Sequence, residues 1–387
     1  MTQSRELHAK SRDAPRVTAL MVFLMVNGTR VLPAIVVCAL LIAACNTRSS
    51  TPARPTIGFR DLFDSVRTTT LSPPPVASVR QGVDLLVDGD RVIVVDAAAS
   101  NLKVFSRSTG AFRYVIGAPG DLAGDFRQPV SIAPVESGGF VVLDGLRKIL
   151  SFRAPTGSDA SDVSIPGVWV ELTTDPLDSS LIISGRDALL RNRPDANNQL
   201  HEFNFRGHLV RSFFPAEKLA SRWATTFNYA FVGMEGQYIL AGTFNSNIVH
   251  VFDRRGTPIS SFPVAPGWFK SLDWPPDGPP PPGETGANEG AKWLKSHTIM
   301  AGIVPIANGR FLTRFESYSV AGEKLYNYAL ATVQGVTVAV TQASRARITR
   351  SAGDTVYWLE PGPNGRYEFG TAVVKTPSSL PVTSKIH

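Results

Sequence analysis

The sequence is poor in residues that carry redox, disulfide or metal chemistry. It has two cysteines, Cys38 and Cys45, and six histidines among 387 residues. Since both cysteines lie near the N-terminus, a domain that begins beyond them has no disulfide framework and depends on its apolar core. The sequence also lacks the Gly-x-Ser-x-Gly, His-Glu-x-x-His, Cys-x-x-Cys and phosphate-loop motifs, which removes the clearest signatures of several enzyme classes.

The sequence also has little net charge. Charged residues make up 18% of the sequence, and the formal net charge is +7. Residues 1–44 contain five basic and two acidic residues, so the rest of the sequence carries +4. A surplus this small is not typical of a nucleic-acid-binding surface, and we expect no nucleic-acid partner.

The sequence has no apolar run long enough for a stable transmembrane helix, but a shorter run occupies residues 31–44, after Arg30. This length and the preceding basic residue are typical of the core of a signal peptide. The end of the run, Ile42-Ala43-Ala44-Cys45, resembles the lipobox of bacterial lipoproteins. The resemblance implies that residues 1–44 are a signal peptide and that Cys45 is acylated. The alternative is a buried N-terminal helix with an incidental cysteine.

The residues around this signal lead to two further expectations. A compact signal peptide would start at Met21 or Met25. Residues 45–56 are polar and interrupted by proline, so we expect a flexible tether that reaches at most about 40 Å. An acylated Cys45 would hold the protein on a membrane of the cell envelope, facing the periplasm or the exterior.

Beyond the tether, helical periodicity is nearly absent, with one weak exception at residues 59–66. Short apolar runs alternate instead with glycine, proline and aspartate, a pattern typical of β-strands. A glycine that ends one of these runs recurs at Gly110, Gly157, Gly207 and Gly256. A repeat of nearly fifty residues with four short strands is the signature of a β-propeller blade. The next candidate is Gly335, and the insertion at residues 265–297 accounts for the longer interval before it.

These repeats predict an all-β, six-bladed β-propeller over residues 57–387. The predicted inner strands begin at Val83 and lie near residues 130–135, 168–173, 229–233, 299–306 and 346–350. The sixth repeat lacks an outer strand, and the strand before it would be left as an open edge. We therefore predict that a segment between Ile57 and Leu71 supplies the missing strand and closes the ring.

The connection from the first repeat to the second reads GAPGDLAGDFRQP, from Gly117 to Pro129. It resembles the blade pattern of the NHL-type six-bladed propellers, within the NHL- and TolB-like group. The matching residues are Gly117, Gly120, Gly124, Asp125, Phe126 and Pro129. The resemblance is close in the first repeat and looser along the remaining chain. It implies the propeller fold, and it gives Phe126 the role of an apolar anchor for the crossing.

Connections on the two faces of the predicted propeller differ in length. Turns on one face are tight, whereas the other face carries the long segments 118–128, 185–199, 215–227 and 265–297. Long loops on one face of a rigid scaffold are where propellers build binding sites. The candidate binding residues of this long-loop face are Trp223, Trp268, Trp274, Trp293 and His297. In the alternative reading, the tryptophans form the small core that keeps the insertion ordered.

We therefore expect a non-catalytic, membrane-tethered propeller that binds a small molecule or a protein through its long-loop face, without a cofactor. The alternative follows from the resemblance, because some six-bladed propellers are metal-dependent lactonases or amidating lyases. A divalent cation at the channel mouth would then be held by Asp84, Glu171, Asn228 and His297.

If no metal binds, these and other carboxylates have simpler expected roles. Asp84 and Glu171 lie on predicted inner strands together with Arg350, and we expect all three to line the channel. Asp96 and Asp144 recur at equivalent repeat positions, so we expect them to be structural and to bond the corner between the second and third strands.

Overall fold

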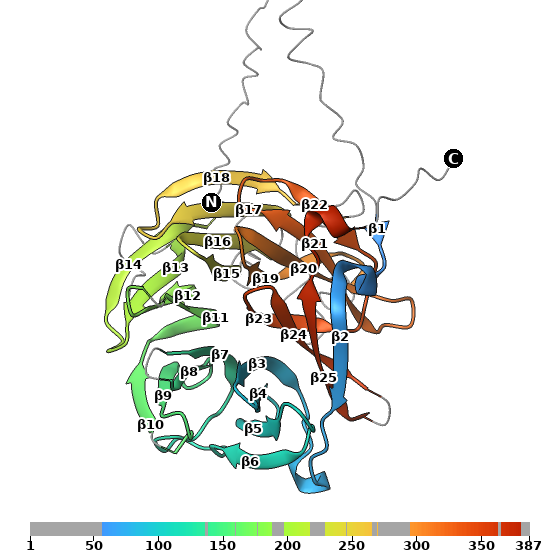
Figure 1. The fold of residues 1–387 in the computed structure, drawn as a ribbon. Coiled ribbons are helices and arrows are strands. Elements are labelled where there is room, and N and C mark those ends of the chain that lie inside the picture. The colour runs from blue at the N-terminus through green and yellow to red at the C-terminus, as the bar shows by residue number, and fades with distance from the viewer. Residues whose placement is uncertain are drawn as a thin grey trace, which may run out of the picture. The chain divides into compact units, whose positions relative to one another are not determined.

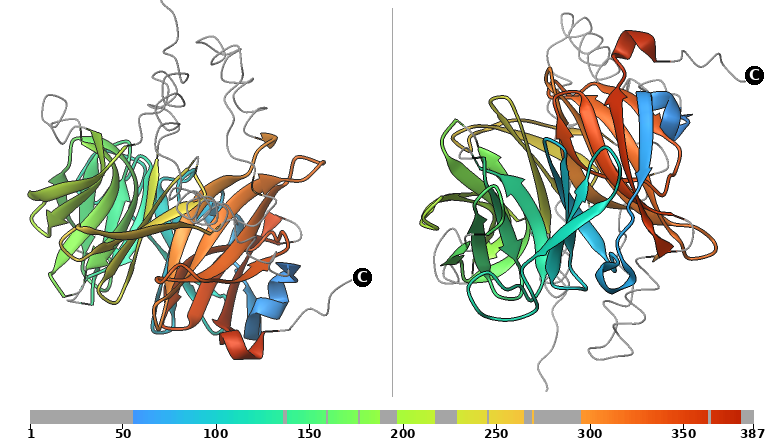
Figure 2. Two further views of the ribbon diagram at one scale, coloured as in Figure 1. Left: turned by 90° about the horizontal axis from the view of Figure 1, so that it is seen from above. Right: turned by 60° about the horizontal axis from the view of Figure 1, so that its bottom comes forward.

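The structure is a computed structural model that describes residues 56–380, except 136–137, 159, 176, 188–196, 217–228, 245, 265–268, 270–294 and 363–364. The described strands form six sheets around a common axis (Figures 1 and 2). The all-β, six-bladed propeller predicted from the repeats is confirmed. Among the described residues, no helix has the length and apolarity needed to cross a bilayer.

The first three blades each contain four consecutive strands, with the inner strand first. Blade 1 comprises β3 (Gly82–Asp88), β4 (Arg91–Asp96), β5 (Asn101–Ser106) and β6 (Phe112–Ile116). Blade 2 comprises β7 (Pro129–Pro134), β8 (Phe140–Asp144), β9 (Ile149–Arg153) and β10 (Ala160–Ser164). Blade 3 comprises β11 (Gly167–Asp175), β12 (Ser180–Asp187), β13 (Asn198–Asn204) and β14 (Leu209–Pro215).

The last three blades follow the same order, with additions from the N-terminal segment. Blade 4 comprises β15 (Ala230–Glu235), β16 (Tyr238–Thr243), β17 (Ile248–Asp253) and β18 (Pro258–Pro263). Blade 5 comprises β19 (Ile299–Ile306), β20 (Arg310–Tyr318), β21 (Lys324–Thr332) and β22 (Thr337–Thr341), with β1 (Thr56–Ile57) at its edge. Blade 6 comprises β23 (Arg347–Ala352), β24 (Thr355–Pro361), β25 (Tyr367–Val374) and β2 (Phe63–Thr70).

The ring closes as the sequence predicts, because β2 is the outer strand of blade 6. It pairs antiparallel with β25, from Phe63 opposite Val374 to Thr70 opposite Glu368. At the axis, each inner strand contacts the inner strands of the two neighbouring blades, and β23 contacts β3. We call this junction of blades 6 and 1 the seam.

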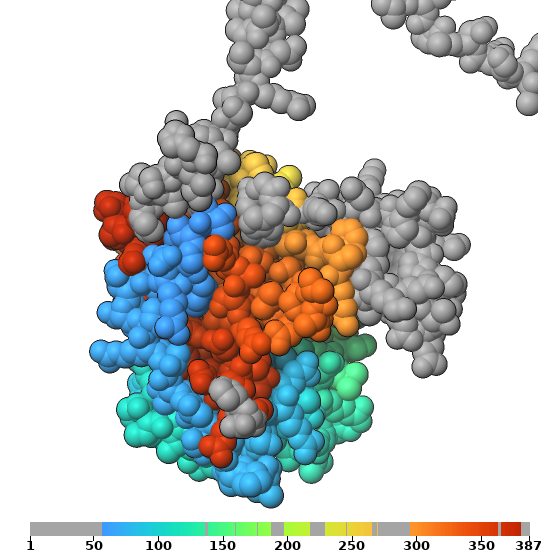
Figure 3. Space-filling view, turned by 90° about the vertical axis from the view of Figure 1, so that its right-hand side faces the viewer, coloured from blue at the N-terminus to red at the C-terminus, as the bar shows by residue number. Residues whose placement is uncertain are grey.

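The N-terminal segment also binds blade 5, which the sequence did not predict. Strand β1 pairs parallel with β22, with Thr56 opposite Val340. The short 3-10 helix η1 (Phe59–Leu62) then leads to β2, so the weak helical pattern gives one turn of helix and no more. Figure 3 shows this blue segment lying along the orange and red strands. The segment therefore fastens blades 5 and 6 to each other. Two further 3-10 helices are η2 (Pro75–Ala77) and η6 (Pro377–Ser379).

The repeated glycines have a shared structural reason. Each has a positive φ, from +70° at Gly110 to +87° at Gly335. A Cβ atom at each position would also meet the outer strand of the preceding blade: Val163 of blade 2 at 2.0 Å from Gly207, and Phe213 of blade 3 at 2.9 Å from Gly256. A Cβ atom at Gly110 would meet the carbonyl oxygen of Thr70 on β2. Blade 6 therefore contacts blade 1 in the same way as blades 2 and 3 contact the next blade along the chain. The glycine turn is therefore where successive blades touch.

The crossing from blade 1 to blade 2 is anchored by Phe126, as predicted. Its ring is fully buried among core residues of both blades. Gly117 allows the ring to approach, since a Cβ there would lie 2.5 Å from the ring. The guanidinium of Arg153 covers the ring, and its Nη2 donates to the carbonyl of Gly124 at 2.6 Å. Between the other blades, similar apolar clusters hold each sheet against the next.

Candidate functional site

The repeated aspartates are structural, which confirms the prediction. Asp96 and Asp144 end the second strands of blades 1 and 2, and both are fully buried. Each accepts hydrogen bonds from backbone amides before its inner strand and after its own strand. The donors are the amides of Arg80, Gln81 and Ala99 for Asp96, and of Arg127, Gln128, Leu146 and Arg147 for Asp144. Their oxygens are therefore committed to the fold.

The centre of the propeller holds a cluster of charged side chains, as expected for Asp84 and Arg350. Asp84 on β3 is 5% exposed and forms an ion pair with Arg350 on β23, across the seam. Its Oδ2 also accepts from the hydroxyl and amide of two blade 2 residues, Ser131 and Ile132, each at 3.0 Å. The carboxylate thus joins blades 6, 1 and 2.

Glu171 on β11 brings a second carboxylate to this cluster from blade 3. Its Oε2 accepts the amide hydrogen of Val232 at 3.1 Å. Burial raises the pKa of Glu171, and the nearby cations of Arg350 and Arg314 oppose this shift without cancelling it. Arg314 comes from β20 and donates to the carbonyl of Ile348 at 2.5 Å. We call Asp84, Ser131, Glu171, Arg314 and Arg350 the axial cluster.

The donor set of the axial cluster does not fit a divalent cation. Both oxygens of Asp84 already accept from Arg350, with Nε at 3.1 Å from Oδ1 and Nη2 against Oδ2. Two guanidinium groups accompany the two carboxylates, so a cation placed among them would meet like charge. Among the described residues, no group of three or more His, Cys, Asp or Glu side chains is arranged to hold a metal ion.

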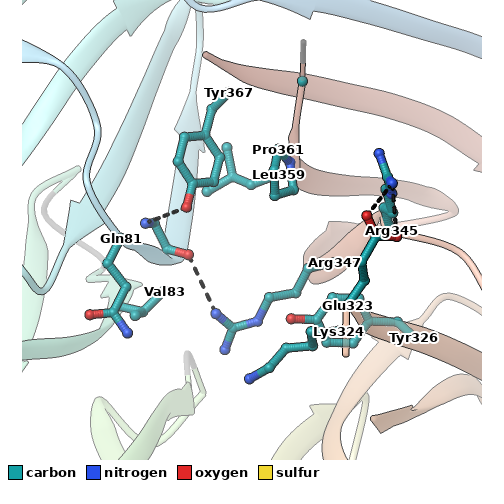
Figure 4. A pocket seen from close by; sticks show the side chains of 12 residues that line it. Gln81, Val83, Glu323, Lys324, Tyr326, Arg345, Arg347, Leu359, Pro361 and Tyr367 are labelled. Atoms are coloured by element: carbon teal, nitrogen blue, oxygen red, sulfur yellow. Dashed lines mark hydrogen bonds and ion pairs between the residues drawn. The ribbon is translucent and has the colours of Figure 1, made fainter. Parts of the chain in front are cut away.

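A cavity of about 440 Å³ opens at the seam. Its walls are Gln81–Val83 of blade 1, Glu323, Lys324 and Tyr326 of blade 5, Arg345 between blades 5 and 6, and Arg347, Leu359, Pro361, Gly362 and Tyr367 of blade 6. We call it the seam pocket; Figure 4 shows its lining side chains. Its volume lies within the range of small-molecule sites.

The backbone of Gly82 crosses the seam pocket, and both its amide and its carbonyl are hydrogen-bonded. Its amide donates to the hydroxyl of Tyr367 at 3.4 Å, and its carbonyl accepts from Nη1 of Arg347 at 3.4 Å (Figure 4). Gly82 itself packs tightly, since a Cβ there would lie 2.9 Å from a methyl group of Leu359. Blade 6 thereby fixes the first residue of the blade 1 inner strand.

The seam pocket lies on the long-loop face. Every inner strand runs from the blade-to-blade connection toward the tight turn, and the pocket is lined by the first residues of β3 and β23. A second cavity, of about 360 Å³, lies at the opposite ends of the inner strands and is lined by Glu235, Arg350, hydroxyl side chains and aliphatic side chains such as Val232 and Ile303. Since its described lining contains no aromatic ring, the seam pocket offers the better surface for an organic ligand.

Described parts of the insertion lie against blade 5 on this same face. Phe269 packs edge-on against Phe315 near the end of β20, with ring centroids 5.4 Å apart. At the other end of the insertion, the ammonium of Lys295 lies 5.9 Å from the ring of Tyr318. Lys324, which lines the seam pocket, approaches the same ring at 5.9 Å. Both ends of the insertion therefore reach the wall of blade 5 beside the pocket.

The structure describes only part of the predicted site. His297 lies two residues before β19, is partly exposed, and its Nδ1 lies 3.0 Å from the hydroxyl of Ser296. Six predicted residues lie outside the described residues: Cys45, Trp223, Asn228, Trp268, Trp274 and Trp293. The residues of the seam pocket were not predicted. The one signal for them was the pair of arginines, Arg345 and Arg347, at the start of an inner strand.

Comparisons with known proteins agree with this architecture. No family model matches the chain, and no curated protein matches its sequence. Solved structures do match. A protein of Bacteroides fragilis that is described as exported has 11% identity and a TM-score of 0.58, over 84% of this chain and 98% of that chain. A DUF4221 member from Bacteroides vulgatus has 9% identity and a TM-score of 0.57, over 81% and 97%. A protein described as a gluconolactonase has 12% identity and a TM-score of 0.50, over 84% and 98%. At these identities the likeness establishes the fold alone.

Proposed function

We propose that this protein is a lipid-anchored propeller of the cell envelope that binds a ligand through its long-loop face and catalyses no reaction. The observation that carries the proposal is the seam pocket. It combines two tyrosines and apolar side chains with charged side chains at a junction of blades, so it can contact an apolar body and bind a polar group of the same ligand. The insertion departs from the same face, and its tryptophans, Trp268, Trp274 and Trp293, are proposed to contribute to binding.

The lipid anchor is supported by the lipobox-like sequence that ends at Cys45. The fold begins at Thr56, so the tether is short enough to keep the propeller within about 40 Å of the membrane. The similarity to an exported Bacteroides protein agrees with an envelope location. In cells that express the full chain, we expect a palmitate analogue to label the protein and Cys45→Ser to prevent labelling. Labelling of the Cys45→Ser variant, or none of the wild-type chain, would refute the anchor.

Ligand binding can be tested by blocking the pocket. Gln81 is exposed at the pocket wall, and its backbone makes its hydrogen bonds to Asp96 and Ala97, so a new side chain there should be tolerated. A thermal-shift screen of small molecules against the tethered domain should give stabilising ligands. Gln81→Trp should remove their effect without lowering the melting temperature of the free protein. Ligands that stabilise both proteins equally would place binding elsewhere.

A metal-dependent hydrolase or lyase is the competing function. It requires a divalent cation held by residues such as Asp84, Glu171, Asn228 and His297. The ion pair of Asp84 with Arg350 argues against it, because that carboxylate already has a cationic partner. Metal analysis of protein purified without chelators should find less than one cation per chain. One cation per chain that is lost in Glu171→Gln or His297→Ala would refute our proposal and support a metal-dependent enzyme.

A further inference from the structure

The seam pocket has an apolar side. Leu359 is almost fully buried at its base, and the rings of Tyr326 and Tyr367 form two of its walls. Val83 and Pro361 complete this surface (Figure 4). The hydroxyl of Tyr367 accepts the Gly82 amide, so its own hydrogen remains available to a ligand in the pocket. A ligand that fills this space has to present an apolar body to it.

The charged residues of the pocket are unevenly compensated. Arg345 donates two hydrogen bonds to the carboxylate of Glu323, at 2.6 and 2.8 Å. Lys324 forms an ion pair with Glu316, outside the pocket, at 2.8 Å. Arg347 is different: among the described residues, no carboxylate lies within ion-pair distance of its guanidinium. After these pairs are formed, one positive charge remains in the pocket.

A second cation behind the pocket adds to this positive potential. Arg314 is 5% exposed, and its guanidinium lies over the ring of Tyr326 at 6.0 Å. Burial lowers the pKa of Arg314, and repulsion from Arg347 lowers it further. The two guanidinium groups therefore destabilise each other, and a negative charge beside Arg347 would relieve this repulsion.

We propose that the seam pocket binds a carboxylate with an apolar body, in which Arg347 anchors the carboxylate and Tyr367, Leu359 and Pro361 contact the body. This inference rests on the proposed function and names its ligand class. Guanidinium groups bind carboxylates through two parallel hydrogen bonds, which gives both strength and orientation. A monoanion matches the single uncompensated charge. A phosphate dianion would leave a net negative charge in a pocket that already contains Glu323.

The test compares acids with their neutral amides. The probes are monocarboxylates of increasing apolar size, from butyrate through octanoate and phenylbutyrate to naphthoate, each paired with its primary amide, together with phenyl phosphate. Binding to the full chain is measured by calorimetry. The larger acids should bind saturably, and each should bind about tenfold or more tightly than its amide, because the amide loses the charge-assisted hydrogen bonds.

Two arginine variants assign the anchor. Arg347→Gln should reduce the affinity for the acids to that for the amides. The matched Arg113→Gln should leave the difference intact, because Arg113 pairs with Asp90 on blade 1 and does not line the pocket. Since Arg347 also holds the Gly82 carbonyl, its melting temperature is recorded in parallel. If Arg347→Gln is unstable, Tyr367→Phe serves instead: it keeps the ring and should weaken the acids more than the amides.

The outcomes separate this inference from the proposed function. Amides that bind as well as acids, in a manner blocked by Gln81→Trp, would overturn the carboxylate assignment and leave the pocket as a binding site. Tighter binding of phenyl phosphate than of any acid would overturn the monoanion. If no acid binds better than its amide and screening ligands ignore Gln81→Trp, both the inference and the proposed site are wrong.

Discussion

Asp84 on the first inner strand and Arg350 on the last form a buried ion pair that closes the ring at its axis. Arg350 Nε lies 3.1 Å from Asp84 Oδ1, and its Nη2 contacts Oδ2. The side chains are 8% and 20% exposed, so solvent screens the pair little. The seam thus has two fastenings, this pair at the centre and the β2–β25 pairing at the rim.

Breaking the axial pair should destabilise the propeller strongly. Arg350→Met leaves the Asp84 carboxylate buried without its cation, a change that costs about 3 to 5 kcal/mol in buried pairs. Urea unfolding should show this loss, and the double variant Asp84→Asn/Arg350→Met should lose less than the two single variants combined. Arg345→Gln is the matched control, because its exposed pair with Glu323 should change stability little. Additive losses in the double variant would show that the pair is not coupled.

The glycine turns give a second prediction, with an internal control. Gly207 and Gly353 both have positive φ, at +76° and +60°. Alanine at Gly353 meets no atom within 4 Å and should cost about 1 to 2 kcal/mol for the backbone alone. Alanine at Gly207 would also collide with Val163 of the preceding blade and should cost about 2 kcal/mol more. Equal unfolding free energies for the two variants would mean that blade contact does not determine this position.

Truncation should separate the tether from the ring closure. A chain that starts at Thr56 retains β1, η1 and β2, and it should unfold at the same temperature as the longer chain. A chain that starts at Ser72 lacks all three elements and exposes the edge of β25, so we expect aggregation or a large drop in melting temperature. Circular dichroism and size-exclusion chromatography measure both effects. A stable, monomeric chain from Ser72 would show that the N-terminal strand is dispensable.

Stability should depend on pH through Glu171. Although the residue is partly exposed, its carboxyl group accepts a backbone hydrogen bond and is buried, and this burial raises its pKa in the folded state. A raised pKa stabilises the fold below the unfolded value, and this contribution is lost as pH rises through the folded value. Glu171→Gln removes the titration. The variant should match the wild-type protein in acid and become the more stable of the two toward neutral pH.

Denaturant unfolding at several pH values measures this difference. Glu323→Gln is the matched control, because it removes an exposed carboxylate whose ion pair with Arg345 should contribute little to stability. A difference between Glu171→Gln and wild type that does not change with pH, or that reverses, would contradict the assignment of a raised pKa.

The repeat pattern allowed the fold to be predicted in some detail. Glycine spacing located the blades because the turn needs a positive φ and the neighbouring blade leaves no space for a side chain, so the residue type at that position is strongly restricted. Strand alternation placed Asp84, Glu171 and Arg350 on inner strands for a similar reason, since side chains on these strands point either to the channel or to the sheet interface. The pairing of β1 with β22 was not predicted, because two residues carry too little pattern.

The candidate site was harder to predict than the fold. The seam pocket combines residues from three blades that are far apart in sequence, and Gln81, Arg347 and Tyr367 have no shared spacing or motif. Whether an arginine has a carboxylate partner also depends on the tertiary structure. Arg345 and Arg347 are two residues apart, yet only Arg345 pairs with Glu323.

The sequence by itself determined the number of blades, the strand that closes the ring and the structural role of the repeated aspartates, because each follows from the repeat pattern or from the point where that pattern is incomplete. Only the tertiary structure decided which charges are neutralised. Asp84 meets Arg350 across the chain, whereas Arg347 lies where the described residues offer it a carbonyl and no carboxylate. Ion pairing depends on distances between segments that are remote in sequence, and no repeat period encodes them.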